Sequence, residues 1–128
     1  MITPKADTKD YRQINLKNGI KVLLISNPKT EKAAMAMNVH VGSYSDPDEY
    51  PGLAHFLEHM FFRGCEGFPD STALNAAMED FGGVLDGFTA RDCSSYHTTV
   101  HPEHVREAIE IFGSMFLAST FSDIDVER

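Results

Sequence analysis

The dipeptide Asn18-Gly19 separates two short runs that have the residue pattern of β-strands. Residues 11–17 alternate polar and apolar side chains, and residues 20–26 are β-branched and aliphatic. Asn-Gly is a strong indication of a β-hairpin, because both residues accept the positive φ angles of a tight type I′ turn. Residues 33–41 alternate again, with methionine and valine on one face. The first third of the chain therefore predicts three antiparallel strands.

The remaining two thirds combine helical patterns with a second pair of strands. Apolar spacing and end signals predict helices over residues 52–62, 72–81 and 103–118, and strands over residues 84–89 and 94–100. The resulting order is βββ-αα-ββ-α. Strands from both ends of the chain can then pair antiparallel, with the helices packed on one face of the sheet. We therefore expect an α+β fold in a single domain that spans residues 1–128.

The composition of the chain argues against some classes of binding partner. The formal net charge of −8 argues against nucleic acid, because phosphate binding needs a basic face. No run of about 18 apolar residues is present, so we expect no membrane span. The first ten residues lack the apolar middle of a signal peptide, which says little about the compartment. We expect a soluble protein and leave the choice between cytoplasm and periplasm open. Cys65 and Cys93 are not spaced like a zinc ribbon or a redox pair, so free thiols are expected, with a disulfide left open.

The segment that carries chemistry is His55-Phe56-Leu57-Glu58-His59. In a helix, His55 and His59 lie about 40° apart around the axis on successive turns, and Glu58 lies within the same arc of about 100°. Zinc prefers such nitrogen donors and lowers the pKa of a bound water, from which a neighbouring carboxylate can take a proton. The alternative is a solvated polar face without metal. The apolar neighbours Leu53, Phe56, Leu57, Met60 and Phe61 are expected to pack the helix while the polar face looks into a cleft.

Several further motifs occur in order around this segment. They are Leu16–Ile25, His40-Val41-Gly42-Ser43, Asp46-Pro47, Gly52–Met60, Phe62, Gly82-Gly83, Phe88-Thr89 and Tyr96. Together they make the chain resemble the N-terminal part of the pitrilysin/insulysin family of zinc metallopeptidases, the inverzincins, over nearly its whole length. The resemblance implies that His55 and His59 are zinc ligands and that Glu58 is the catalytic general base, acting on water at the metal. It implies one Zn²⁺ per site and hydrolysis of peptide bonds in extended peptides.

The same resemblance assigns residues to substrate binding. Residues 84–89 match an edge strand that pairs with an extended substrate through its backbone, which points to Asp86, Gly87 and Phe88. The family usually has Asn-Ala at Asp86-Gly87, so the aspartate could alter preference and the glycine could loosen the strand. Phe62 matches an aromatic residue that lines the pocket past the scissile bond. An ordinary strand and a plain core phenylalanine are the alternatives. His40, His97, His101 and His104 are expected to be structural or exposed.

The chain also departs from the family pattern. The third zinc ligand of the family is a glutamate on a later helix, which falls beyond Arg128. We therefore expect a truncated domain that is weakly active or inactive alone and that partners the remainder of a peptidase chain or associates with itself. The other functions considered are a non-catalytic interaction domain that retains the fold, which the intact His-x-x-Glu-His argues against, and a structural metal site, which the adjacent Glu58 disfavours.

Overall fold

The computed structural model describes residues 6–127, and its contacts divide the chain into two compact units, residues 1–31 and 32–128. The first unit is the expected hairpin of β1 (Asp10–Asn15) and β2 (Lys21–Ser26), paired antiparallel from Asp10 opposite Ser26 to Asn15 opposite Lys21. Gly19 turns the chain with a φ of 91°. Leu16 and Lys17, expected in the first strand, belong to the turn. The single-domain expectation stays a prediction.

The second unit is built on a three-stranded antiparallel sheet in the order β3-β5-β4. Its strands are β3 (Ala33–Val39), β4 (Val84–Thr89) and β5 (Ser94–Val100). The third strand of the chain thus has its hydrogen-bonded partner in β5, with Ala33 opposite Val100. Strands β4 and β5 form a hairpin in which Val84 lies opposite Thr99. The last two strands have the bounds that their alternation predicted.

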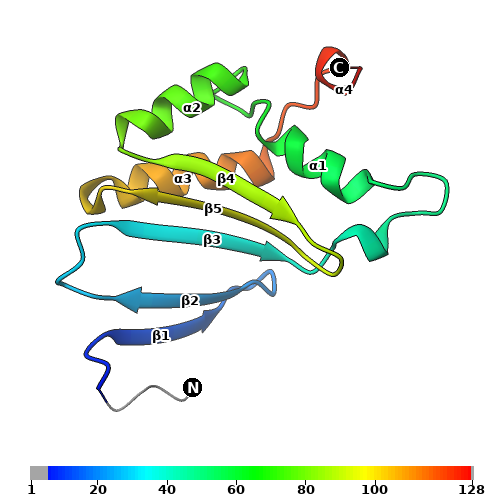
Figure 1. Ribbon diagram of the computed structural model, residues 1–128. Helices are drawn as coiled ribbons and strands as arrows, with labels where there is room; N and C mark the ends of the chain where they lie inside the picture. The colour runs from blue at the N-terminus through cyan, green and yellow to red at the C-terminus, as the bar shows by residue number, and fades with distance from the viewer. Residues whose placement is uncertain (1–5, 128) are drawn as a thin grey trace. The chain divides into compact units, whose positions relative to one another are not determined.

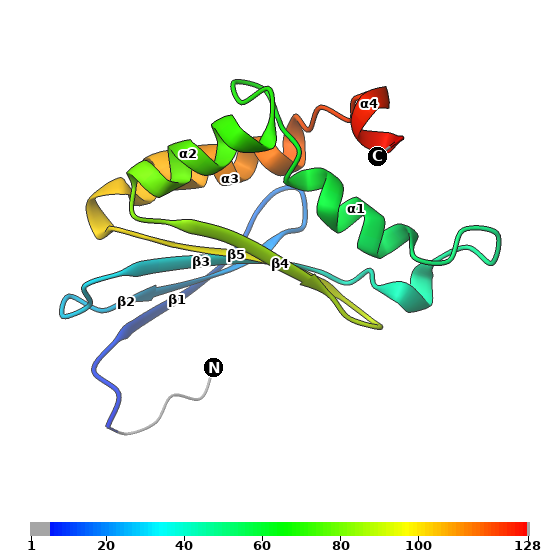
Figure 2. The ribbon, with the colours of Figure 1, turned by 45° about the horizontal axis from the view of Figure 1, so that its top comes forward.

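Helices lie on one face of this sheet, as Figures 1 and 2 show. They are α1 (Leu53–Phe61), α2 (Ser71–Asp80) and α3 (Val105–Leu117). Helix α2 begins where the Asp70 carboxylate accepts the backbone N–H of Ala73 at 2.9 Å, as an N-cap does. The short α4 (Asp123–Val126) and the 3₁₀ turns η1 (Ser43–Ser45) and η2 (Pro102–His104) were not predicted. The α+β class and the order of the main elements are confirmed.

The core of the second unit lies between the sheet and the helices. Its buried residues are Cys65, Leu74, Met78, Tyr96, Val100, Ala108, Ile111, Phe112 and Met115. Tyr96 of β5 packs edge-on against Phe61 of α1 and Phe116 of α3, with ring centroids 5.3 and 5.0 Å away. These contacts hold both helices against the strand that forms the middle of the sheet. Both cysteines are free thiols, as expected.

None of the helices formed by residues 6–127 is long and apolar enough to cross a membrane.

Candidate metal centre

Helix α1 brings the two candidate metal ligands together. The Nε2 atoms of His55 and His59 lie 2.8 Å apart, and their rings stack with centroids 4.8 Å apart and an interplanar angle of 27°. Both side chains are exposed on the surface of the helix. The spacing of four residues produces this geometry directly, because it places the two side chains on successive turns of one face. Both imidazoles therefore present a nitrogen lone pair or N–H to the same point.

The donor pair fits a zinc ion. Two imidazole nitrogens bound at about 2.0–2.1 Å to a tetrahedral ion lie roughly 3.3 Å apart. The observed separation of 2.8 Å would need to open by about 0.5 Å, which small side-chain rotations of two exposed rings provide. Within residues 6–127, no set of three or more His, Cys, Asp or Glu side chains is placed to share a metal ion. In this part of the chain the candidate metal ligands are therefore the two histidines His55 and His59.

Glu58 differs from its histidine neighbours because it is buried, with only 7% of its surface exposed. Its Oε2 atom accepts a hydrogen bond of 2.5 Å from the Thr89 hydroxyl, at the end of β4. Among residues 6–127 no buried side-chain oxygen lacks a partner, and Oε1 of Glu58 has no donor in this part of the chain. Oε1 is therefore the oxygen that remains open to solvent. The sequence places Glu58 beside the histidines but gives no indication of its contact with Thr89.

The β4–β5 hairpin carries further hydroxyl groups near Thr89. Ser94 lies opposite Thr89 in the strand register and donates its hydroxyl to the carbonyl of Val41 at 2.9 Å. Tyr96 follows on the same face of β5 and is 2% exposed. Burial raises the pKa of Tyr96 to about 12, and the negative charge of Glu58 acts in the same direction. A hydrogen bond with Ser94 acts against this rise. The phenol therefore stays neutral beneath the site at ordinary pH.

Asp46 caps the start of α1, a role that no local sequence pattern indicates. Asp46 accepts the backbone N–H of Gly52 at 2.7 Å and that of Ala54 at 2.8 Å, which are donors at the start of α1. The N-cap residue itself, Gly52, has no side chain to do this. Asp46 was noted only as part of a family motif, because a cap six residues upstream of the helix has no local sequence pattern. It fixes the turn of α1 from which His55 projects.

The residues expected to bind substrate gather at strand β4. Among the described residues, β4 pairs with β5 alone, so its other edge has no strand beside it. Phe88 is exposed, and Asp86 lies 3.7 Å from His97 on β5. The backbone N–H of Gly87 donates to the Asp86 carboxylate at 2.8 Å. The Asp86 carboxylate thus accepts the hydrogen bond of the Gly87 N–H, which an added strand would use.

Phe62 ends α1 and lies against the same strand. A Cβ atom at Gly87 would be 3.1 Å from Cζ of Phe62, so ring and strand are in close contact. Phe62 is half-buried and also packs 6.1 Å from the ring of Tyr96. It therefore belongs to the edge of the core as well as to the surroundings of β4. Its assignment to substrate binding, like those of Asp86, Gly87 and Phe88, stays a prediction.

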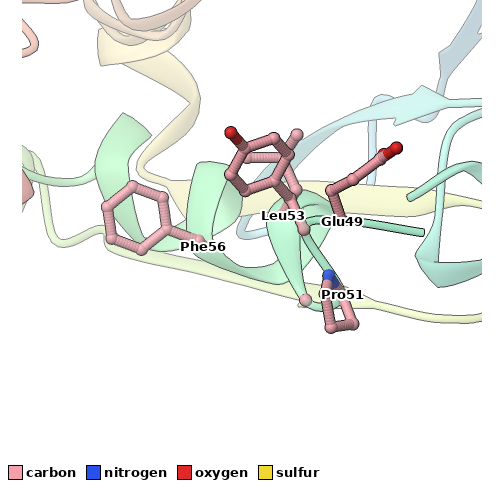
Figure 3. Close-up of a pocket in the computed structure, with 6 residues that line it drawn as sticks. Glu49, Pro51, Leu53 and Phe56 are labelled. Atoms are coloured by element: carbon pink, nitrogen blue, oxygen red, sulfur yellow. The ribbon is translucent and has the colours of Figure 1, made fainter. Parts of the chain in front are cut away.

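The expectation that apolar neighbours bury α1 is wrong for three residues. Met60 is buried and Phe61 is half-buried, whereas Leu53, Phe56 and Leu57 are 46, 41 and 37% exposed. Leu53 and Phe56 line an open hollow of about 400 Å³ together with Glu49, Tyr50, Pro51 and Gly52 (Figure 3). A second hollow, of about 370 Å³, is lined by Leu57, Phe61, Phe116, Leu117, Ser119 and Phe121. Neither hollow includes the histidine pair, so α1 carries apolar surface beside its polar site.

The other histidines lie away from the pair. His101 and His104 lie 3.8 and 3.7 Å from the carboxylate of Glu103, and His104 also stacks on Phe81 with centroids 4.8 Å apart. His97 faces Asp86 across the sheet. His40 is exposed. The two histidines that the structure brings together are therefore His55 and His59.

Comparison with known proteins places this chain in a family. Residues 21–128 match the family model described as insulinase, peptidase family M16. The chain therefore belongs to the insulinase family of metallopeptidases. It is 39% identical over 122 residues to the insulin-degrading enzyme of Homo sapiens, covering 95% of this chain and 12% of that protein. It is 38% identical over 122 residues to "Insulin-degrading enzyme-like 2" of Arabidopsis thaliana, covering 95% and 13%.

A solved structure agrees with the sequence comparison. The crystal structure of pitrilysin superimposes with a TM-score of 0.89 at 31% identity, covering 97% of this chain and 13% of that one. The resemblance to pitrilysin and insulysin that the motifs predicted is thus confirmed. The chain spans about an eighth of the length of these relatives.

Proposed function

We propose that the protein is a zinc-dependent endopeptidase in which His55 and His59 hold the metal and Glu58 is the general base. The approach of the two Nε2 atoms to 2.8 Å is the observation that carries this proposal, because it turns a sequence motif into a pair of donors aimed at one point. Membership of a metallopeptidase family supports it. Zinc, when bound, would act as a Lewis acid and would lower the pKa of a water molecule.

Glu58 is suited to the proton transfers of peptide hydrolysis. Its Oε2 atom is held by Thr89, and its Oε1 atom is open to accept a proton from the attacking water. The same carboxyl group can then pass that proton to the departing amine, which must be protonated to leave. Burial of the rest of the side chain restricts the carboxylate to one position, so each turnover needs no conformational search by this group.

Extended peptides are the proposed substrates, and the free edge of β4 is the proposed binding strand. A peptide that adds to this edge forms main-chain hydrogen bonds with the outward-facing backbone groups of β4, those of Gly87 among them, and such binding tolerates many side chains. Thr89 at the end of the strand contacts Glu58, so a peptide on β4 would lie beside the general base. Phe62, which contacts Gly87, would line the pocket for a side chain past the scissile bond.

The remaining zinc ligand is proposed to come from a glutamate beyond Arg128. The exposed apolar surface of α1 supports a further partner, because contiguous apolar patches of this kind mark surfaces that another protein segment covers. We propose that the rest of a longer peptidase chain covers it, and that self-association does so when the 128 residues are alone. With two protein ligands in place of three, the short chain should bind zinc weakly and be weakly active or inactive.

The test measures zinc content and cleavage of a quenched fluorescent peptide in the protein at its full encoded length. Glu58→Gln should retain zinc while its kcat falls by at least about 100-fold, because the proton acceptor is lost. His55→Ala and His59→Ala should lose both zinc and cleavage. His101→Ala, a histidine remote from the pair, is the matched control and should change neither. Less than about a tenth of an equivalent of zinc in the unaltered protein would refute the proposal.

The same measurements test the alternative of a non-catalytic interaction domain. Zinc bound without cleavage in the unaltered protein would favour a non-catalytic domain that retains the peptidase fold. The 128-residue chain, assayed beside the longer protein, shows what the segment beyond Arg128 contributes. Light scattering on the short chain tests self-association, and a monomer at high concentration would contradict that part of the proposal.

A further inference from the structure

Thr89 connects the catalytic helix to the proposed substrate strand. It is the last residue of β4, and its hydroxyl donates to Oε2 of Glu58 at 2.5 Å, across 31 residues of sequence. Its side chain lies on the helical side of the sheet, as does that of Leu85, which packs against the core, whereas Asp86 and Phe88 are exposed on the other side. The residue is half-buried. The hydrogen bond is therefore partly shielded from solvent, between α1 and the sheet.

The hydroxyl groups of Thr89 and Ser94 donate to different acceptors. A hydroxyl group has one proton to give, and an ionised carboxylate can only accept. Ser94, whose oxygen lies 3.4 Å from that of Thr89, gives its proton to the Val41 carbonyl at 2.9 Å. The proton of Thr89 is thus directed to Glu58. Ser94, fixed by Val41, packs behind Thr89 from the opposite strand position and limits the rotation of its side chain.

Glu58 depends on this one donor to an unusual degree. It is buried, and within residues 6–127 no Lys, Arg or His side chain forms an ion pair with it. A carboxylate in such a place needs a hydrogen-bond partner, and without one its torsions are free to turn it toward solvent or toward the metal donors. Either movement displaces the oxygen that must accept the proton.

Building on the proposed function, we propose that Thr89 is a positioning residue that holds Oε2 of Glu58 so that Oε1 faces the attacking water. The role is one of geometry, since Thr89 itself contacts neither the histidine pair nor the oxygen that takes the proton. A group that orients a catalytic side chain in this way typically contributes about 10- to 100-fold to activity. The effect should fall on kcat and not on KM, because substrate binds along β4 before the proton moves.

The experiment compares Thr89→Val, Thr89→Ser and Thr98→Val in the full-length protein. Valine keeps the shape of threonine and removes the hydroxyl, whereas serine keeps the hydroxyl. Thr98 is the matched control, since it is buried on β5 and its hydroxyl has no contact with Glu58. Thr89→Val should lower kcat by about 10- to 100-fold with KM within about twofold and zinc content unchanged. Thr89→Ser should keep kcat within about threefold of the value for the unaltered protein. Thr98→Val should also keep kcat within that range.

Several outcomes would overturn the proposal. A kcat for Thr89→Val within about twofold of the unaltered value, or an equal loss in Thr89→Ser, would show that the hydroxyl does not matter. Loss of zinc in parallel with activity would show a structural effect on the metal site. If Thr89→Val does not fold, Thr89→Cys, with a weak donor of similar size, should still lower kcat by at least about fivefold, and an unchanged kcat would refute the role.

Failure of the Thr89 proposal is distinguishable from failure of the proposed function. If Glu58→Gln is inactive while Thr89→Val is fully active, Glu58 is the base and Thr89 does not position it. If Glu58→Gln cleaves the peptide as well as the unaltered protein does, the proposed function itself fails.

Discussion

The Asp46 carboxylate accepts the backbone N–H of Ala54 at 2.8 Å, immediately before His55 in the sequence. Its second oxygen accepts the N–H of Gly52, so one side chain pairs two donors of the first helical turn. These N–H groups have no acceptor within the helix, and a negative charge at this end is favourable for the helix dipole. The loop before α1 and the metal-donor turn are therefore fixed to each other.

Replacing Asp46 by alanine should lower the free energy of unfolding by about 1–2 kcal/mol, which is the usual cost of losing a capping side chain. Chemical denaturation followed by circular dichroism measures the change. Asp48→Ala is the matched control in the same loop, because Asp48 is exposed, and it should cost less than about 0.5 kcal/mol. Equal effects of the two substitutions would contradict a capping role for Asp46.

Replacing Gly87 by alanine, the residue that the family usually has there, should destabilise this protein by about 1 kcal/mol. The added Cβ atom would lie 3.1 Å from the ring of Phe62 and 3.1 Å from the carbonyl oxygen of Ser95, which is tighter than ordinary contact. A double-mutant cycle with Phe62→Leu tests the cause, because removal of the ring should recover part of the loss. Full stability in the single variant would show that the Phe62 ring moves aside freely.

Replacing Asp86 by alanine should lower KM for extended peptides by up to about fivefold. The Asp86 carboxylate accepts the Gly87 N–H at 2.8 Å, so a peptide carbonyl must displace it, and a hydrogen bond of this kind is worth about 1 kcal/mol. Steady-state kinetics on the quenched peptide gives the value. His97→Ala removes the partner of Asp86 but leaves the Gly87 N–H covered, so it serves as the control. A higher KM in Asp86→Ala would mean that the aspartate contacts substrate.

The free energy of unfolding at high pH should depend on the buried phenol of Tyr96. Its pKa is raised to about 12 in the folded protein, mainly by burial, against about 10 in an unfolded chain. The resulting stabilisation is fully present below pH 10 and is lost as the pH rises toward 12, because the unfolded chain releases its proton first. Between pH 9 and 11.5 the free energy of unfolding should fall more for the unaltered protein than for Tyr96→Phe, by up to about 2 kcal/mol. Parallel curves would contradict this assignment.

Local patterns were sufficient to predict the elements of the fold. Strands over residues 84–89 and 94–100 have their predicted bounds, and the helices differ by one or two residues at their ends. Alternation and helical spacing report on the neighbours of each residue along the chain, so they need no knowledge of distant contacts. The partner of β3 was harder to predict, because the choice of β5 depends on which strands meet after the chain has turned back.

The chain alone determined the histidine pair, since a separation of four residues on a helix brings two imidazoles together whatever surrounds them. Only the tertiary structure decided that Glu58 is buried against Thr89, that Asp46 holds the start of α1, and that Leu53, Phe56 and Leu57 remain exposed. Those relationships join residues 8 to 31 positions apart or depend on which face another element covers. Packing in three dimensions settles them, because a residue's burial and partners are properties of its surroundings and not of its sequence neighbours.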